Sequence, residues 1–105
     1  MIDVIKPAVA AGRYYIGPHA GLRQADRMIT TDDLQEAFGS DAPEVIEDYP
    51  DDPRGHTCLV RGETADKRIL HLVCAEPDNT LFIVTCYQPD PAIWYPQFKK
   101  RRGTP

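Results

Sequence analysis

The sequence predicts an α+β domain in which N-terminal helices pack on an antiparallel sheet of about four strands. Residues 18–38 repeat their apolar side chains with the period of amphipathic helices. After residue 43 the chain carries apolar runs joined by short connectors, which is typical of antiparallel strands. The 105 residues suffice for one domain with one modest core. We place this core at about residues 13–95, and a basic C-terminal segment follows at 99–105.

The first elements are short. Residues 2–11 are a helix candidate that Pro7 starts or interrupts and that the next glycine ends. Arg13–Ile16 is a strand-like run followed by the turn-forming pair Gly17-Pro18.

Two consecutive helices are expected within residues 18–38. In the first, His19, Arg23 and Arg27 stand four residues apart and share one face. We expect this basic face to be exposed and the other side to be buried. The side expected to be buried carries Ala20, Gly21, Leu22, Ala25 and Met28.

The second helix of this stretch carries its own start signal. Thr30 can cap its N-terminus, and Asp33 can complete a capping box three residues later. Ile29 can pack on Leu34 as a hydrophobic staple. The apolar stripe of this helix consists of Leu34, Ala37 and Phe38.

The sheet is expected from a brief strand at Val45–Tyr49 and three longer apolar runs. These runs are His56–Glu63, Ile69–Ala75 and Leu81–Tyr87. The connectors are short, and the second contains a Pro77-Asp78 turn signal, so neighbouring strands should be antiparallel. Simple alternation places one set of side chains against the helices: Cys58, Val60, Phe82 and Val84, facing Leu22, Ala25, Leu34 and Phe38.

The charge is unevenly distributed. The formal net charge is −4, but residues 99–102 are all basic, so residues 1–98 carry 8 basic against 16 acidic side chains. Such an acidic body argues against broad nucleic-acid binding and leaves room for one small phosphate site. Three dispersed cysteines within apolar runs indicate buried thiols and a cytoplasmic location. Without an apolar run of about 20 residues, no membrane association is expected.

The arrangement of potential ligands and nucleophiles excludes several site classes. The histidines and cysteines lack the paired short spacings of metal sites, so neither a metal nor another cofactor is expected. The cysteines have no neighbours that would lower a thiol pKa. No glycine-rich phosphate loop or dinucleotide fingerprint occurs.

A scattered set of polar residues in the strands is chemically coherent. Thr85 and Tyr87 share one face of their strand, and His71 and Arg61 complete the set if they point the same way. Together they could bind a phosphate and move a proton. Other interpretations stay open: His71 as a hydrogen-bonded core histidine, Tyr87 as a strand-end tyrosine, and the helical arginines as a solvated face.

The sequence also resembles a known group of proteins. A His-Ala-x-x-x-Arg-x-x-x-Arg helix, a Val-Ile-Glu-Asp-Tyr strand, an apolar histidine strand and a Val-Thr-x-Tyr strand resemble a family of small bacterial domains of unknown function. That family is similar to RelE-type and MqsR-type toxins, and the likeness covers roughly residues 13–95. The chain departs from it at Met28, where the family often has glycine, and in its acidic body.

The resemblance implies a RelE-like fold and the toxin-like half of a bacterial toxin–antitoxin pair, acting as a metal-independent mRNA interferase. It implies catalytic roles for His71, Thr85 and Tyr87. Substrate binding would fall to His19, Arg23 and Arg27, joined by Arg61 on chemical grounds. The implied partners are an antitoxin-like protein and RNA or the ribosome. Two alternatives remain: a non-catalytic protein-binding module of the same fold, and a housekeeping domain without phosphate chemistry.

Overall fold

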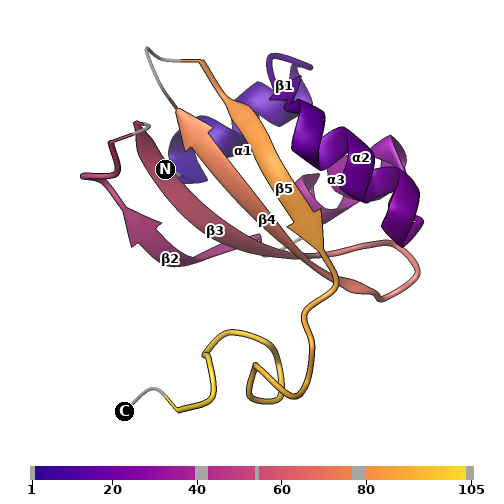
Figure 1. Ribbon diagram of the computed structural model, residues 1–105. Coiled ribbons are helices and arrows are strands. Elements are labelled where there is room, and N and C mark those ends of the chain that lie inside the picture. Colours follow the sequence, from indigo (N-terminus) through magenta and orange to yellow (C-terminus); the bar gives the residue numbers. More distant parts are fainter. Residues whose placement is uncertain (1, 40–42, 54, 77–79, 104–105) are drawn as a thin grey trace.

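The computed structural model describes residues 2–39, 43–53, 55–76 and 80–103. Within them the chain forms three helices and one five-stranded sheet (Figure 1), which confirms the α+β class. The elements are α1 (Ile2–Ala10), β1 (Tyr15–Ile16), α2 (Pro18–Arg27), α3 (Thr31–Gly39), β2 (Glu44–Tyr49), β3 (His56–Glu63), β4 (Ile69–Glu76) and β5 (Phe82–Tyr87). None of the helices described is both long and apolar enough to span a bilayer.

The sheet has the strand order β1-β5-β4-β3-β2 and is mixed. The last four strands form the expected antiparallel meander, although the turn expected at Pro77-Asp78 lies outside the described residues. The additional strand is β1, which pairs in parallel with β5. Tyr15 N–H donates to the carbonyl of Leu81 at 2.9 Å, and Gly17 N–H donates to that of Ile83 at 3.0 Å. Two residues are too few to reveal their partner by periodicity, so the expectation of four antiparallel strands was wrong at this edge.

The core lies between the helices and one face of the sheet. Phe38 and Leu34 are buried there together with Cys58 and Val60, as alternation predicted. Gly62 lets α3 approach β3 closely, because a Cβ at this position would stand 2.4 Å from the carbonyl oxygen of Ala37. The three cysteines are free and buried.

The capping box of α3 is confirmed. Thr30 N–H donates to Asp33 Oδ2 at 2.9 Å, and Asp33 N–H donates to Thr30 Oγ1 at 3.0 Å. Arg68 adds an ion pair to the same carboxylate, at 2.8 Å. Ile29 and Leu34 are both buried in the core, as the hydrophobic staple requires.

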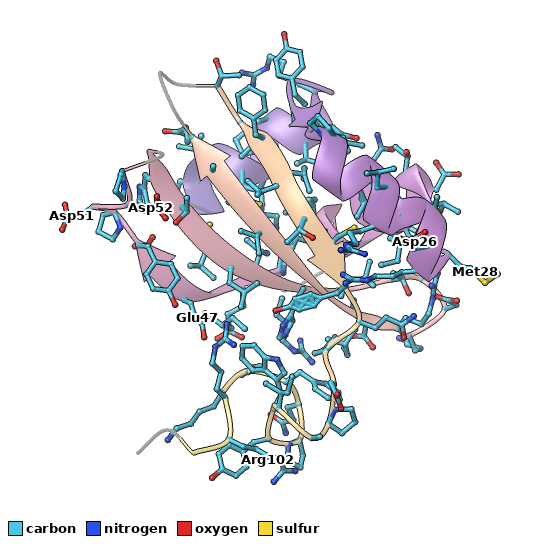
Figure 2. The ribbon with its side chains drawn as sticks, in the orientation of Figure 1. Asp26, Met28, Glu47, Asp51, Asp52 and Arg102 are labelled. Carbon is cyan, nitrogen blue, oxygen red and sulfur yellow. The ribbon has the colours of Figure 1, made fainter. Side chains whose placement is uncertain are left out.

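Helix α2 buries a different side from the one expected. Ala20 is fully buried, but Leu22 and Met28 are 68% and 82% exposed, and Ala25 is also exposed. Met28 projects away from the sheet beyond the end of the helix (Figure 2). The helix lies along β5, and Arg27 near its end donates from Nη1 to the carbonyl of Cys86 at 2.7 Å. Of the five residues expected on the buried side, Ala20 alone is buried.

Strand β5 contains a bulge, so its side chains do not alternate between the two sheet faces as predicted. Val73 pairs with Thr85 and Cys74 pairs with Ile83, which leaves Val84 as an inserted residue. Ile83 is therefore fully buried on the helix side, and Val84 does not join the buried core. Phe82 instead stacks on Tyr15 with ring centroids 5.4 Å apart. The expectation that Phe82 and Val84 face the helices was wrong.

The segment after β5, residues 88–103 (called the tail below), folds back against the sheet face that the helices leave uncovered (the open face). Its Trp94 is 2% exposed. The tail carbonyls of Gln97 and Phe98 accept hydrogen bonds from Arg61 Nε at 2.6 Å and His71 Nε2 at 2.8 Å. Figure 1 shows the tail in yellow at one end of the strands. The tail thus becomes part of whatever site the open face holds.

Candidate functional site

Three predicted site residues form a row across the open face. Arg61 on β3 pairs with His71 on β4, and His71 pairs with Tyr87 on β5. Paired residues of antiparallel strands share a face, so the expectation that these side chains point the same way is confirmed. Thr85 lies on the same face, opposite Val73.

His71 is fully buried between Tyr87 and the tail. Its Nε2 lies 2.8 Å from the carbonyl oxygen of Phe98, which can only accept, so Nε2 carries the proton. Its Nδ1 lies 3.2 Å from Tyr87 Oη and is therefore the acceptor for the phenol proton. Burial lowers the pKa of His71, which favours this neutral form. The Trp94 ring meets the imidazole edge-on, with centroids 4.4 Å apart.

Tyr87 is the member of this pair that reaches the surface cavities. Its side chain is half-buried at the end of β5, where the strand leaves the sheet. Burial raises the pKa of Tyr87, so the phenol stays protonated at neutral pH. In this arrangement the phenol proton points at His71 Nδ1, so Tyr87 can give it to a bound molecule when its O–H bond turns away from His71.

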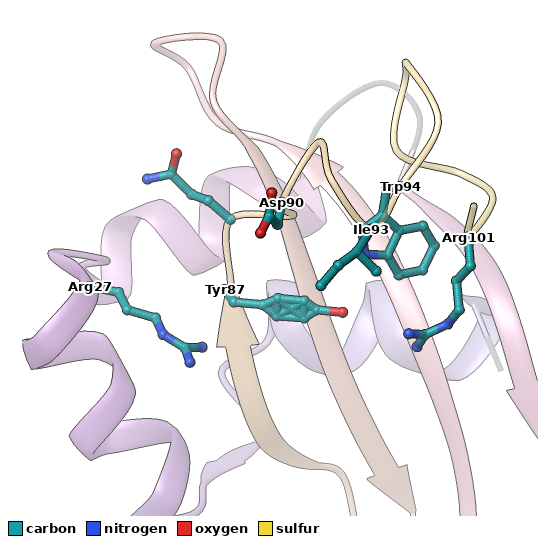
Figure 3. Close-up of a pocket in the computed structure, with 7 residues that line it drawn as sticks. Arg27, Tyr87, Asp90, Ile93, Trp94 and Arg101 are labelled. Atoms are coloured by element: carbon teal, nitrogen blue, oxygen red, sulfur yellow. The ribbon is translucent and has the colours of Figure 1, made fainter. Parts of the chain in front are cut away.

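Two arginines flank Tyr87 (Figure 3). Arg27 from α2 places its Cζ 6.0 Å from the centroid of the Tyr87 ring. Arg101 from the tail makes a two-point ion pair with Glu47, at 2.6 and 3.0 Å, and lies over the Trp94 ring with its Cζ 4.6 Å from the centroid. The hydrogen bond from Arg101 lowers the pKa of Glu47, so this carboxylate remains ionised.

The hollow between α2, Tyr87 and the tail is called the arginine cavity here. It has a volume of about 480 Å³. Both arginines reach it, and one carboxylate, that of Asp90, lines it as well (Figure 3). The lining residues are Arg27, Tyr87, Gln88, Asp90, Ile93, Trp94 and Arg101.

A second hollow, called the tyrosine cavity, lies over β2, β3 and β4. Its volume is about 300 Å³, and it shares Tyr87 and Arg101 with the arginine cavity. The lining residues are Glu47, Tyr49, Asp52, Thr57, Cys58, Leu59, Val73, Tyr87 and Arg101.

The other residues predicted for the site lie elsewhere. Arg23 pairs with Asp26 at 3.5 Å on the outer side of α2. Arg61 anchors the tail through Gln97 and lines neither of the two cavities. Thr85 is also absent from both linings, and the side chain of His19 lies outside the described part of the chain.

Sequence reasoning missed the residues that the tail and β2 contribute. Arg101 belongs to the basic residues 99–102 and Glu47 to the acidic body, whose opposite charges could have suggested their pairing. Trp94 was recognisable as the single tryptophan in a proline-rich segment. In the described ranges, no three metal-ligating side chains gather into a site.

Comparison with known proteins identifies the family. Curated proteins and solved structures gave no match to this chain. One family model, described as "Domain of unknown function (DUF4258)", matches residues 16–88. The matched segment runs from β1 to the start of the tail and includes the row from Arg61 to Tyr87. Because the match covers more than half of its 105 residues, the chain belongs to the DUF4258 family of domains of unknown function.

Proposed function

We propose that this protein is the toxin-like component of a bacterial toxin–antitoxin pair and cleaves RNA at the arginine cavity without a metal ion. The observation that carries this proposal is the Tyr87–His71 hydrogen bond placed between Arg27 and Arg101. A protonated phenol whose ring is held by His71 beside two guanidinium groups suits proton transfer at a phosphodiester. The likeness to RelE-type toxins supports the same reaction.

The proposed step uses the RNA's own 2′-hydroxyl as the nucleophile. Its oxygen bonds to the adjacent phosphorus, the bond from phosphorus to the 5′-oxygen breaks, and the products are a 2′,3′-cyclic phosphate and a free 5′-hydroxyl. Asp90, which lines the cavity, accepts the 2′-hydroxyl proton. Tyr87 turns its O–H bond from His71 Nδ1 to the 5′-oxygen and gives its proton there. Arg27 and Arg101 stabilise the added negative charge on the phosphate. His71 is a positioning residue, because it is buried and contacts the cavity only through Tyr87.

The proposed protein partner is an antitoxin-like protein that binds α2, the helix carrying His19, Arg23 and Arg27. Two features support this surface: the guanidinium of Arg23 lies at the surface, and the apolar side chains of Leu22 and Met28 are largely exposed. A protein bound there would also cover Arg27 and so close one side of the arginine cavity.

A non-catalytic protein-binding module is the second candidate. The observation that favours it is the complete engagement of His71, whose two ring nitrogens contact Tyr87 and the Phe98 carbonyl. The acidic body points the same way, because it repels RNA outside the arginine cavity.

The test is cleavage of a labelled single-stranded RNA by purified protein, with and without a chelator and with and without ribosomes. We expect cleavage that survives the chelator, a cyclic phosphate on the product and no cleavage of the matching DNA. Tyr87→Phe should lower the rate roughly 10²–10⁴-fold. Tyr15→Phe is the matched control, since Tyr15 is 63% exposed on β1. Intact RNA under all conditions would favour the binding module.

A further inference from the structure

The tyrosine cavity differs from the arginine cavity in its charge. Carboxylates of Glu47 and Asp52 line it, and both lie on the β2 side of the sheet (Figure 2). Its single guanidinium, that of Arg101, is held by Glu47 through two short contacts. With two carboxylates and one guanidinium, this lining disfavours a phosphate and favours an uncharged group with N–H donors.

The remaining lining suits a flat ring. Leu59 and Val73 supply an apolar surface from β3 and β4, and Tyr49 and Tyr87 supply aromatic rings. Tyr49 is 50% exposed, so much of its surface is available for a further contact. Its hydroxyl donates to Glu47 Oε1 at 2.9 Å, which restricts the ring to one orientation. Nucleobases bind such rings by stacking.

The two cavities share Tyr87 and Arg101, so one ligand can occupy both. The volume of about 300 Å³ lies at the lower end of the range for small-molecule pockets, about 300–1,000 Å³, and accommodates one base. Asp52, which already accepts a hydrogen bond from Thr57 at 3.1 Å, adds its carboxylate to the lining of this space.

We propose that the tyrosine cavity is a nucleobase subsite that selects guanine, with the attached phosphate in the arginine cavity. This inference rests on the proposed function, because it names the substrate feature that the same site reads. Guanine is favoured because its Watson–Crick edge carries adjacent N–H donors, which match a carboxylate, whereas uracil offers a single ring N–H.

The experiment measures binding of guanosine 3′-monophosphate, uridine 3′-monophosphate and inorganic phosphate to the purified protein by NMR titration. We expect the guanosine nucleotide to bind at least tenfold more tightly than the uridine nucleotide. Tyr49→Ala should weaken guanosine nucleotide binding at least tenfold and leave phosphate binding unchanged. Tyr49→Phe, which loses the same hydroxyl but keeps the ring, should restore most of the affinity. Asp52→Asn should reduce the preference for guanine.

The outcomes separate this inference from the proposed function. Equal binding of both nucleotides, or equal binding by the Ala and Phe variants, overturns the subsite even if RNA is cleaved. Guanine-selective binding that depends on the ring of Tyr49 supports it even if RNA stays intact, and then only the cleavage reaction fails. Absence of nucleotide and phosphate binding at millimolar concentration overturns both.

Discussion

Trp94 is buried where the tail meets the open face, and its replacement by alanine tests how the tail is held. The side chain is 2% exposed and lies edge-on to His71 and beneath Arg101. A buried tryptophan removes up to about 250 Å² from water, which at about 25 cal/mol per Å² corresponds to about 6 kcal/mol. Truncations of this kind in protein cores cost roughly 3–5 kcal/mol.

The loss of stability should be confined to the tail, because Trp94 is not part of the core cluster between the helices and the sheet. We expect Trp94→Ala to release the tail while the sheet remains folded. The amides of Tyr95, Phe98 and Arg102 donate to backbone carbonyls within the tail. Their protection from hydrogen exchange should fall more than about 100-fold, the equivalent of roughly 3 kcal/mol, and that of β4 less than about tenfold. NMR-detected hydrogen exchange measures both.

The matched control is Ile93→Ala, which truncates the neighbouring side chain of the tail. This side chain is 51% exposed. We expect its tail amides to change less than about tenfold. Equal loss of protection in the tail and in β4 would show that the tail unfolds only with the whole domain and would contradict its local release. Unchanged tail protection would show that other contacts hold it.

Three further predictions concern the fold and its pH dependence. Gly62→Ala should lower the free energy of unfolding in urea by about 1–3 kcal/mol, because the added Cβ would stand 2.4 Å from the carbonyl oxygen of Ala37. Met28→Gly should raise stability by about 1 kcal/mol in thermal unfolding, because Met28 ends α2 in the left-handed conformation at φ 55°. The buried His71 has a pKa below its ordinary 6.5, so its contribution to stability should be fully present above pH 6.5 and decrease as the pH falls below it. The stability difference between wild type and His71→Gln should therefore shrink between pH 7 and pH 5.

For each of these three predictions, one result would contradict it. Gly21→Ala is the control for Gly62, since nothing lies within 4 Å of the added carbon, and equal effects at the two glycines would refute the close-approach argument. A destabilised Met28→Gly variant would mean that the methionine makes a contact worth more than its backbone strain. A stability difference at His71 that grows as the pH falls would mean that the imidazole is stabilised as a cation.

Local interactions made much of the fold predictable. The capping box at Thr30 depends on residues within one helical turn. Strand β3 has the predicted bounds because its own residues are enough to identify it as a strand. The buried side of α2 was not predictable in this way. The helix lies along β5 with Ala20 as its buried contact residue, and Leu22 stays outside.

The candidate site was predictable only where strand pairing decides it. Arg61, His71 and Tyr87 follow from antiparallel pairing with short connectors. Arg101 contacts Glu47 across 54 residues of sequence, and no periodicity links two such positions. The carbonyl groups that accept hydrogen bonds from Arg61 and His71 belong to Gln97 and Phe98 of the tail. Both residues have a positive φ, and no glycine in the sequence marks these positions.

The bulge at Val84 connects the fold to the site. In an unbroken strand, Ile83, Thr85 and Tyr87 would share one face, because side chains alternate with a period of two. Ile83 is fully buried against the helices, so Tyr87 would then also face them and lose its hydrogen bond to His71. The inserted Val84 changes the alternation between these positions and lets one strand supply the core with Ile83 and the open face with Tyr87. With Val84 paired in regular alternation, the strand could keep either the buried isoleucine or the Tyr87–His71 pair, but not both.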